Sequence, residues 1–352
     1  MPPTSPRLLS VTFAALCGTA CFPTKNIAAI DTNLGESVAI CPGAWVDLQV
    51  CADMKNGERK CTNSGITGLP WTALHFNWQD DVTKGSVAMP GNPELSWKRN
   101  LDFNVVVNKN ESVTAAAKVA ARYDCSYEAN FSGTPGADGP DGASGASGSD
   151  GNDASKDSQG AYTGAGGEGA DGGDGGDGGD GRHGATPSPV SVQVDTMEGT
   201  DLILVVVQSG DRVRRFVVDS AKGSVNVDAR GGHGGPGGNG GYGSKGGDGG
   251  KGQEQGRGGK GGNGGNGGNG GNGGKGGEVT VHVDPLASGF VRNVTVQNRG
   301  GSAGPAGNAG RPGAGGSTGG TGGTEGTPGT EGRSGVSGPD PQTVTEPLQI
   351  QL

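Results

Sequence analysis

The sequence predicts a mostly β protein with a large glycine-rich part, in which an N-terminal β-sandwich is followed by a bundle of extended glycine-rich helices with β-strands between them. Eight of the 78 glycines precede Gly133, and all four tryptophans lie within the first 100 residues. From Gly133 onward, glycine recurs at every third position over long stretches. The first third of the 352 residues can therefore build an ordinary apolar core, whereas the remainder needs a different kind of packing.

The clearest repeat is residues 258–277, which read GGKGGNGGNGGNGGNGGKGG. An α-helix is disfavoured because glycine in a helix interior costs about 0.5–1 kcal/mol relative to alanine, and a strand of bare glycine has no side chains to pack. A strict period of three fits the extended threefold helix of the polyproline II type, which has no internal hydrogen bonds. Several such helices can hydrogen-bond sideways, and at about 3.1 Å per residue this one would be roughly 60 Å long.

The triplets occur in separate blocks, within residues 132–186, 231–278 and 300–340. In a threefold helix, a triplet with two glycines leaves two rows of positions without side chains along the helix, while a triplet with one glycine leaves a single such row. Another helix can approach closely only along a row without side chains. We therefore expect residues 231–278 to form the core of the bundle, with residues 133–151 and 301–338 at its edges. The irregular triplets at 243–245 and 252–257 are candidate turns between antiparallel helices.

Residues 1–20 have the layout of a secretory signal peptide. One positive charge at Arg7 precedes the apolar run 8–16 and a series of small residues. The apolar run is too short to span a membrane. The ending Gly-Thr-Ala-Cys resembles a bacterial lipobox, which implies that Cys21 becomes the lipidated first residue of the mature protein. Cleavage near Ala20 without a lipid is the alternative.

Four further cysteines predict two disulfides, because an even number of cysteines in an exported domain indicates a disulfide framework with three possible connectivities. These residues are Cys41, Cys51, Cys61 and Cys125. The loop Lys55–Gly57 suits a hairpin that places Cys51 directly opposite Cys61. Cys41 would then pair with Cys125.

Residues 21–131 are predicted to form a compact, disulfide-bonded β domain. Segments of alternating apolar residues are separated by turn signals at Asn56-Gly57 and at 90–93. The alternating segments are Ser37–Cys41, Trp45–Cys51, Trp71–Trp78 and Phe103–Asn108. Residues 115–121 fit either a short helix or part of a longer strand. The length and the alternation favour an immunoglobulin-like sandwich.

Strands are also predicted between and after the glycine blocks, within residues 187–230, 279–299 and 341–352. Leu202–Val207 is apolar on both faces, as a buried strand would be. The other expected strands are Val190–Val194, Val213–Val218, Ser224–Val227, Val279–Val283, Phe290–Gln297 and the terminal Leu348–Leu352. Because such apolar runs need cover, they argue against a wholly disordered glycine-rich region.

Polar residues recur once per triplet and are the candidate ligand-binding groups. An asparagine row and a threonine row could each present a flat hydrogen-bonding surface to a glycan or to ice. The asparagine row consists of Asn263, Asn266, Asn269 and Asn272, and the threonine row consists of Thr318, Thr321 and Thr324. An acidic row contains Asp171, Asp174, Asp177 and Asp180. Its carboxylates are about 9 Å apart, so the row alone cannot supply the roughly 6–8 oxygens of a calcium site. We expect it either to solvate an outer edge or to pair with Lys251, Arg257 and Lys260, and our hypothesis is that it packs beside the glycine block of residues 231–277.

The sequence contains no catalytic constellation. Its four histidines are scattered, and its glycine patterns that match phosphate-binding loops do not open an amphipathic helix. We therefore predict no catalytic residue, no metal ligand and no cofactor. The net charge of −9 argues against a nucleic-acid partner.

The glycine-rich part resembles the polyglycine II bundles of springtail antifreeze proteins and of certain phage tail-tip adhesins, and bacterial glycine-rich surface lipoproteins with GGX repeats. The last likeness is carried by residues 228–232, which lead into the repeat, and 276–281, which leave it for a valine-rich strand. The resemblance covers about residues 133–340 and implies a backbone type more than a function. A collagen-like triple helix is the competing structure, but proline, which collagen favours, is sparse in these triplets.

Together these expectations describe a non-enzymatic, exported protein with a structural or adhesive role. A lipid on Cys21 would hold it in the membrane at the cell envelope or surface, such as the outer membrane; otherwise it would be secreted. Its partners would be surface polysaccharide or other surface proteins. One alternative is a module that binds a glycan, calcium or ice through its polar edge, and another is a collagen-like trimeric stalk. The ligand and the oligomeric state stay open.

Overall fold

The computed structural model of the chain describes residues 22–35, 37–65, 67–77, 82–83, 85–97 and 100–351. The described chain is mostly β, as predicted, with several sheets and few helical turns. It divides after Arg122 into two compact units. The predicted signal peptide and Cys21 lie outside the described residues.

The first unit contains three sheets. The largest has the order β2-β10-β9-β6, in which β10 pairs antiparallel with β9 and parallel with β2. The other two have the orders β1-β4-β5 and β3-β8-β7. The strands are β1 Ile27–Thr32, β2 Val38–Ile40, β3 Trp45–Asp47, β4 Val50–Met54, β5 Arg59–Cys61, β6 Leu74–Asn77, β7 Val82–Thr83, β8 Ser86–Ala88, β9 Asn100–Val107 and β10 Asn110–Ala121. Short helical turns are η1 Thr24–Asn26, η2 Trp71–Ala73 and α1 Pro93–Ser96.

An apolar core holds this unit together, with Val50, Val105 and Val107 fully buried. Residues 115–121 belong to a strand and not to a helix, because Ala117 and Val119 are buried at a spacing of two. The segment predicted as Trp71–Trp78 begins with the turn η2 before β6. The immunoglobulin-like arrangement stays a prediction.

The second unit begins earlier than the predicted boundary at 131, because β11 (Ser126–Asn130) pairs with a strand from beyond the first glycine block. A parallel sheet has the order β11-β15-β17, and a mixed sheet has the order β14-β13-β12-β16-β18. The remaining strands are β12 Val190–Thr196, β13 Leu202–Ser209, β14 Arg212–Asp219, β15 Ser224–Asp228, β16 Val279–Val283, β17 Val294–Gln297 and β18 Gln342–Thr345.

Valines from both sheets fill a second apolar core, including the fully buried Val194, Val205 and Val227. Two strand predictions are wrong here. Phe290 belongs to the 3₁₀ helix η3 (Pro285–Asn293), which begins after the capping residue Asp284 and buries Phe290 in the core. Residues 348–351 follow β18 and do not form the predicted strand. Backbone N–H groups of this tail donate to the carboxylates of Asp284 and Asp195 instead of to a neighbouring strand.

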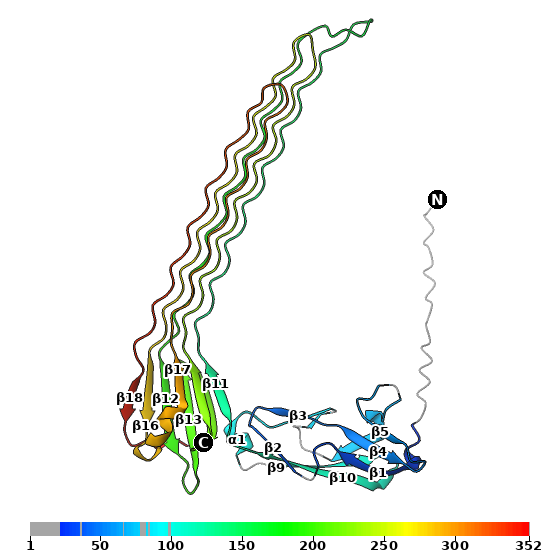
Figure 1. Cartoon of the computed structure of the whole chain (residues 1–352), viewed down its shortest axis with the longest axis vertical. Helices are drawn as coiled ribbons and strands as arrows, with labels where there is room; N and C mark the ends of the chain where they lie inside the picture. The colour runs from blue at the N-terminus through cyan, green and yellow to red at the C-terminus, as the bar shows by residue number, and fades with distance from the viewer. Residues whose placement is uncertain are drawn as a thin grey trace, which may run out of the picture. The chain divides into compact units, whose positions relative to one another are not determined.

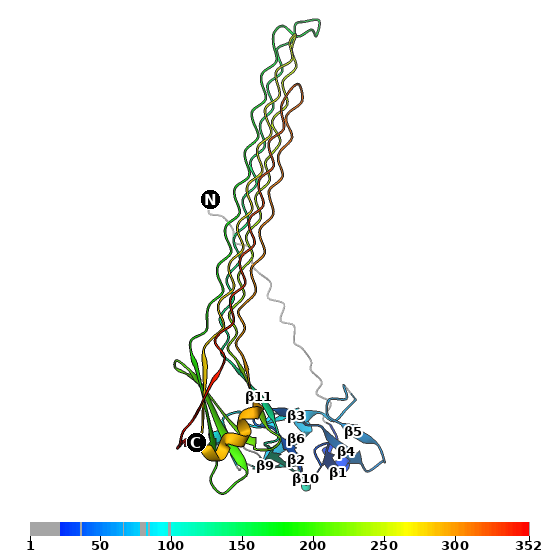
Figure 2. The same cartoon turned by 60° about the vertical axis from the view of Figure 1, so that its left-hand side comes forward.

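Six glycine-rich segments project from these two sheets (Figures 1 and 2). We call them arms 1 to 6; they span residues 133–151, 166–184, 231–250, 256–277, 300–316 and 320–338. Arms 1, 3 and 5 lead away from β11, β15 and β17, and arms 2, 4 and 6 return to β12, β16 and β18. The arms carry no α-helix or β-strand along their length.

Each outgoing arm is joined to a returning arm by a turn. The predicted turn within 252–257 joins arms 3 and 4, whereas the one predicted at 243–245 is wrong. Residue Ser244 continues arm 3, since its N–H donates to Gly173 O like the glycines around it. A turn that was not predicted lies at Thr318-Gly319, where both residues have left-handed backbone angles.

Candidate functional site

The arms are joined by hydrogen bonds that recur at every third residue. Gly268 N–H donates to Gly238 O of arm 3, and Gly267 N–H donates to Thr327 O of arm 6, each over 2.8 Å. Arms 3 and 4 each bond to four other arms, arms 2 and 5 to three, and arms 1 and 6 to two. Residues 231–277 therefore occupy the predicted interior position. The block 301–338 folds back on itself, so only its second half lies at an edge.

Close approach between the arms explains why their inward positions are glycine. A Cβ atom at Gly268 would lie 2.0 Å from Gly179 O, and one at Gly267 would lie 2.2 Å from Gly307 O. At Gly322, which lies in edge arm 6, the nearest atom to such a Cβ is Gly313 O at 3.6 Å. Arms 3 and 4, which have the most neighbours, contain doubled glycines, whereas alanine and proline occur along arms 1 and 5.

The arms form two layers that continue the registers of the two sheets. Arms 1, 3 and 5 run parallel in one layer, and arms 2, 4 and 6 run parallel in the other. Val190 of β12 lies opposite Val279 of β16, an offset of 89 residues, and Asp174 bonds to Asn263 at the same offset. The sheets at the base therefore fix which triplets meet along the arms.

A ladder of side-chain hydrogen bonds crosses the outer face of arms 2, 4 and 6. Asp174 Oδ1 accepts the backbone N–H of Asn263 at 2.6 Å, and Asn263 Oδ1 accepts the N–H and the hydroxyl of Thr324, both at 2.9 Å. The same pattern repeats one and two triplets along the arms, in Asp177–Asn266–Thr327 and Asp180–Asn269–Thr330. In arms 4 and 6 the third residue of these triplets has an N–H that donates to no backbone carbonyl, and this ladder satisfies it.

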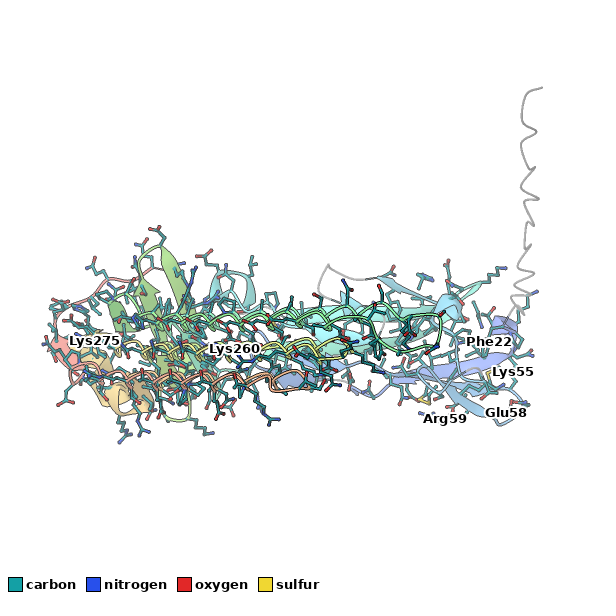
Figure 3. All side chains as sticks on the ribbon, turned by 90° about the horizontal axis from the view of Figure 1, so that it is seen from above. Phe22, Lys55, Glu58, Arg59, Lys260 and Lys275 are labelled. Carbon is teal, nitrogen blue, oxygen red and sulfur yellow. A yellow bond between two sulfur atoms is a disulfide. The ribbon has the colours of Figure 1, made fainter. Side chains whose placement is uncertain are left out.

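Lys260 and Lys275 occupy the equivalent positions before and after the asparagines of arm 4 (Figure 3). Their N–H groups are also capped, by Asp171 Oδ1 and by Thr186 Oγ1. The acidic row therefore packs beside arm 4, as predicted, but its role differs from the expected ion pairing. In the part of the chain that the structure describes, no ion pair joins this row to a lysine or arginine, because its oxygens accept from the backbone instead.

The face of arms 1, 3 and 5 carries a sparser set of similar bonds. Asp141 Oδ1 accepts the N–H of Asn239 at 2.6 Å, and Asn239 Oδ1 accepts the N–H and the side-chain Nδ2 of Asn308, both at 3.0 Å. Nearer the far end of these arms, Asp248 accepts from Ser317 and from the ammonium group of Lys245. The Asp248 carboxylate accepts both hydrogen bonds. The bond from the Lys245 ammonium group and the bond from the Ser317 N–H together lower the pKa of Asp248.

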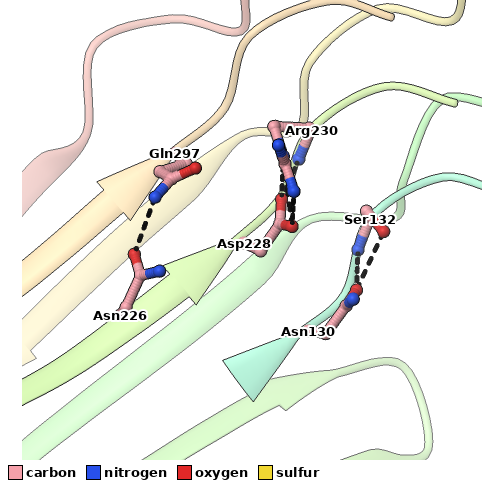
Figure 4. Close-up of polar contacts among 6 residues, drawn as sticks. All are labelled: Asn130, Ser132, Asn226, Asp228, Arg230 and Gln297. Atoms are coloured by element: carbon pink, nitrogen blue, oxygen red, sulfur yellow. Dashed lines mark hydrogen bonds and ion pairs between the residues drawn. The ribbon is translucent and has the colours of Figure 1, made fainter. Parts of the chain in front are cut away.

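Short polar side chains mark the points where strands become arms (Figure 4). Asn130, the last residue of β11, accepts the N–H and hydroxyl of Ser132 through Oδ1, at 3.0 and 2.8 Å. Asp228, the last residue of β15 and the register partner of Asn130, accepts the N–H of Arg230 in the same way at 3.0 Å. Such turns redirect the backbone just before the first glycine of arms 1 and 3. For these two arms the sequence signal is an Asn or Asp three residues before the first glycine.

The Asp228 carboxylate is buried, with 1% of its side chain exposed, and it forms a bidentate pair with the guanidinium of Arg230. Burial alone would raise the pKa of Asp228, but the hydrogen bonds and charge of Arg230 outweigh it and hold the pKa below its ordinary value. The pair therefore favours the ionised carboxylate in the folded state.

The stability of the second unit is expected to depend on the ionisation of Asp228. Because the folded pKa is lowered, the contribution is complete above the ordinary aspartate pKa of about 3.9 and is lost as the pH falls through the lower folded value. The difference in unfolding free energy between wild type and Asp228→Asn should therefore be larger at neutral pH than at about pH 2. Denaturant unfolding at both pH values measures it, and an equal difference at the two would contradict the assignment.

Each asparagine of the predicted ligand row uses one of its two side-chain polar atoms to hold a neighbouring arm. The Oδ1 atoms of Asn263, Asn266, Asn269 and Asn272 accept backbone N–H groups of arm 6. Among the described residues, their Nδ2 groups make no hydrogen bond, and ligand binding by them stays a prediction. The threonines that join this row are Thr324, Thr327 and Thr330, whereas Thr318 lies in a turn.

The cysteines of the first unit lie as the hairpin register predicts. Cys51 and Cys61 are directly opposite in β4 and β5 and form a disulfide, with Cα atoms 3.9 Å apart. Cys41, and Cys125 of the second unit, are each disulfide-bonded too, and their pairing with one another stays a prediction. Across residues 22–351, in the parts that the structure describes, no cluster of three or more His, Cys, Asp or Glu side chains could hold a metal ion.

Comparisons with protein-family models, with characterised proteins and with solved structures found no match to this chain. In the described residues no helix is both long and apolar enough to cross a bilayer.

Proposed function

We propose that this chain is a non-enzymatic, lipid-anchored structural or adhesive protein of the cell surface, in which the six arms form a polyglycine II bundle that serves as a stiff spacer. The observation that carries the proposal is the lateral hydrogen bonding of the arms. It recurs every three residues along the arms, at positions where glycine predominates and where an added Cβ would meet backbone atoms of a neighbouring arm. A period of three with sideways bonding is the pattern of packed threefold helices.

The bonding pattern favours a bundle within one chain over a collagen-like trimer. From Gly231 to Gly247 in arm 3 and from Gly256 to Gly277 in arm 4, the inward N–H groups donate to carbonyls of the same chain, as between Gly271 and Gly235 or between Gly270 and Thr330. These groups are therefore already satisfied without a second or third chain. The two sheets at the base add a further reason, because their registers already align the arms of a single chain.

The spacer role follows from how each arm is supported. A lone threefold helix of glycine is solvated and flexible, whereas an arm bonded along two or more sides cannot bend without breaking a series of bonds at once. A surface protein of this form would hold the turns at the far end of the arms away from the sheets (Figure 1). Partners at the surface would be polysaccharide or other surface proteins.

Metabolic labelling with palmitate tests the anchor. The wild-type chain is expected to incorporate the label and to fractionate with membranes, whereas Cys21→Ala should lose both properties. Cys17→Ala is the matched control, since Cys17 would be removed with the signal peptide, and it should behave like wild type. Label retained by the Cys21→Ala variant would rule out anchoring at this residue.

A further inference from the structure

We propose that the face of arms 1, 3 and 5 carries a saccharide-binding site centred on Tyr242. The site is a depression of about 260 Å³ lined by Asp141, Ser144, Asn239, Tyr242 and Asn308 together with the backbone between them. It lies on the opposite face from the row Asn263–Asn272, which bonds to arms 2 and 6. It requires neither the lipid anchor nor the spacer role, so it goes beyond the function proposed above.

Tyr242 is the only Tyr, Phe or Trp in the six arms, and it is 59% exposed. Its position is fixed from both sides, because its carbonyl accepts Gly145 N–H at 2.9 Å and the N–H of the next residue, Gly243, donates to Arg311 O. The ring is therefore held on a rigid backbone without being packed into a core. An aromatic ring presented in this way offers an apolar surface to the C–H face of a pyranose ring.

The polar side chains beside Tyr242 are each fixed by one atom and free at the other. Asp141 uses Oδ1 to cap Asn239, and Asn239 uses Oδ1 to cap Asn308. Within the described chain, this leaves an oxygen of Asp141, the Nδ2 of Asn239 and the Oδ1 of Asn308 without an intramolecular partner. These groups form a series of acceptor, donor and acceptor. Adjacent hydroxyls of a sugar ring can pair with such a series, because each hydroxyl can both donate and accept a hydrogen bond. Because the side chains are already held in place, binding would cost little side-chain entropy.

The size and charge of the site narrow the saccharide class. Its volume lies below the roughly 300–1,000 Å³ of pockets that enclose a drug-sized ligand, so it suits one sugar ring of a longer chain that continues over the open face. The carboxylate of Asp141 disfavours uronic acids and sulfated sugars, because it would repel their negative charges. The geometry thus points to a neutral polysaccharide.

Affinity electrophoresis of the full mature chain tests this site, with dextran, mannan, galactomannan, xylan, mixed-linkage β-glucan and, as the acidic comparison, polygalacturonate each cast into a separate gel. We expect retardation by at least one of these neutral polymers. Tyr242→Ala should weaken that binding about tenfold, while Tyr242→Phe should keep it, since the ring face is retained. Asp141→Asn should weaken it as well, because the substitution keeps the cap on Asn239 but replaces the free acceptor with a donor. Tyr162→Ala, in the turn between arms 1 and 2, is the matched control and should bind like wild type.

Three outcomes would overturn the proposal. These are no retardation in any neutral polymer, equal retardation of wild type and the Tyr242→Ala variant, and stronger retardation by polygalacturonate than by every neutral polymer. A melting curve for each variant separates loss of binding from loss of fold. If Tyr242→Ala unfolds, the comparison of Asp141→Asn with wild type decides the question, and unchanged binding by that variant would count against the site.

Discussion

Replacing Gly268 with alanine is expected to lower the unfolding free energy of the arms by about 3 kcal/mol or more. The new Cβ would lie 2.0 Å from Gly179 O, a backbone atom that is itself held by the hydrogen bond it accepts from Gly238 N–H of arm 3. Neither arm can move aside without breaking bonds to its other neighbours. The strain therefore spreads along the repeat instead of being relieved locally.

The same replacement at Gly322 is the matched control. The nearest atom to its new Cβ would be 3.6 Å away, and its backbone angle is open to any residue. Gly322→Ala should be neutral or stabilise by about 0.5 kcal/mol, because it restricts only the unfolded chain. Unfolding followed by circular dichroism and by hydrogen exchange of the arm amides measures both variants. Equal stability of the two would contradict close packing of arm 4.

Replacing Asp174 and Asp177 together with lysine is expected to lower the unfolding free energy by about 2 kcal/mol. Each aspartate accepts a backbone N–H of arm 4, of Asn263 and of Asn266, and lysine has no acceptor to offer. The melting temperature of the full chain should fall accordingly.

Replacing the same two aspartates with asparagine separates hydrogen bonding from charge. The double Asn variant should melt close to wild type, because Asn263 already performs the same capping role toward Thr324 in the next arm. If the Asn and Lys variants are destabilised equally, the negative charge is what matters. If the Lys variant melts like wild type, the ladder contributes nothing to stability.

The period of three was enough to predict extended arms and the central place of residues 231–277. The reason is steric, since a position that faces a neighbouring arm has no room for a Cβ atom, as the contrast between Gly268 and Gly322 shows. Turns were harder to predict. Gly316, Gly319 and Gly322 keep the triplet phase through the turn at Thr318, and the shift of phase to Gly326 shows in the sequence only after the chain has folded back.

The sequence could not predict the capping ladder in detail. The acidic row suggested a neighbour of opposite charge, but the partner of Asp174 is a backbone N–H, which is present at every residue and leaves no compositional trace. Which triplet it meets depends on the offset of 89 residues set by β12 and β16, and this offset can be read only once the strands are paired. The site around Tyr242 was missed for the same reason, because Asp141, Asn239 and Asn308 come from three distant blocks.

The parallel layers have a mechanical consequence. A force applied along the arms, between the turns at one end and the sheets at the other, would act across the lateral hydrogen bonds in shear. In that geometry the bonds of an arm, such as those that Gly261, Gly264 and Gly267 make to arm 6, share the load and must fail together. A force that peels one arm sideways would break the same bonds one after another. The unit should therefore resist tension along its length far better than bending away of arm 1 or arm 6, each of which is held by two neighbours only.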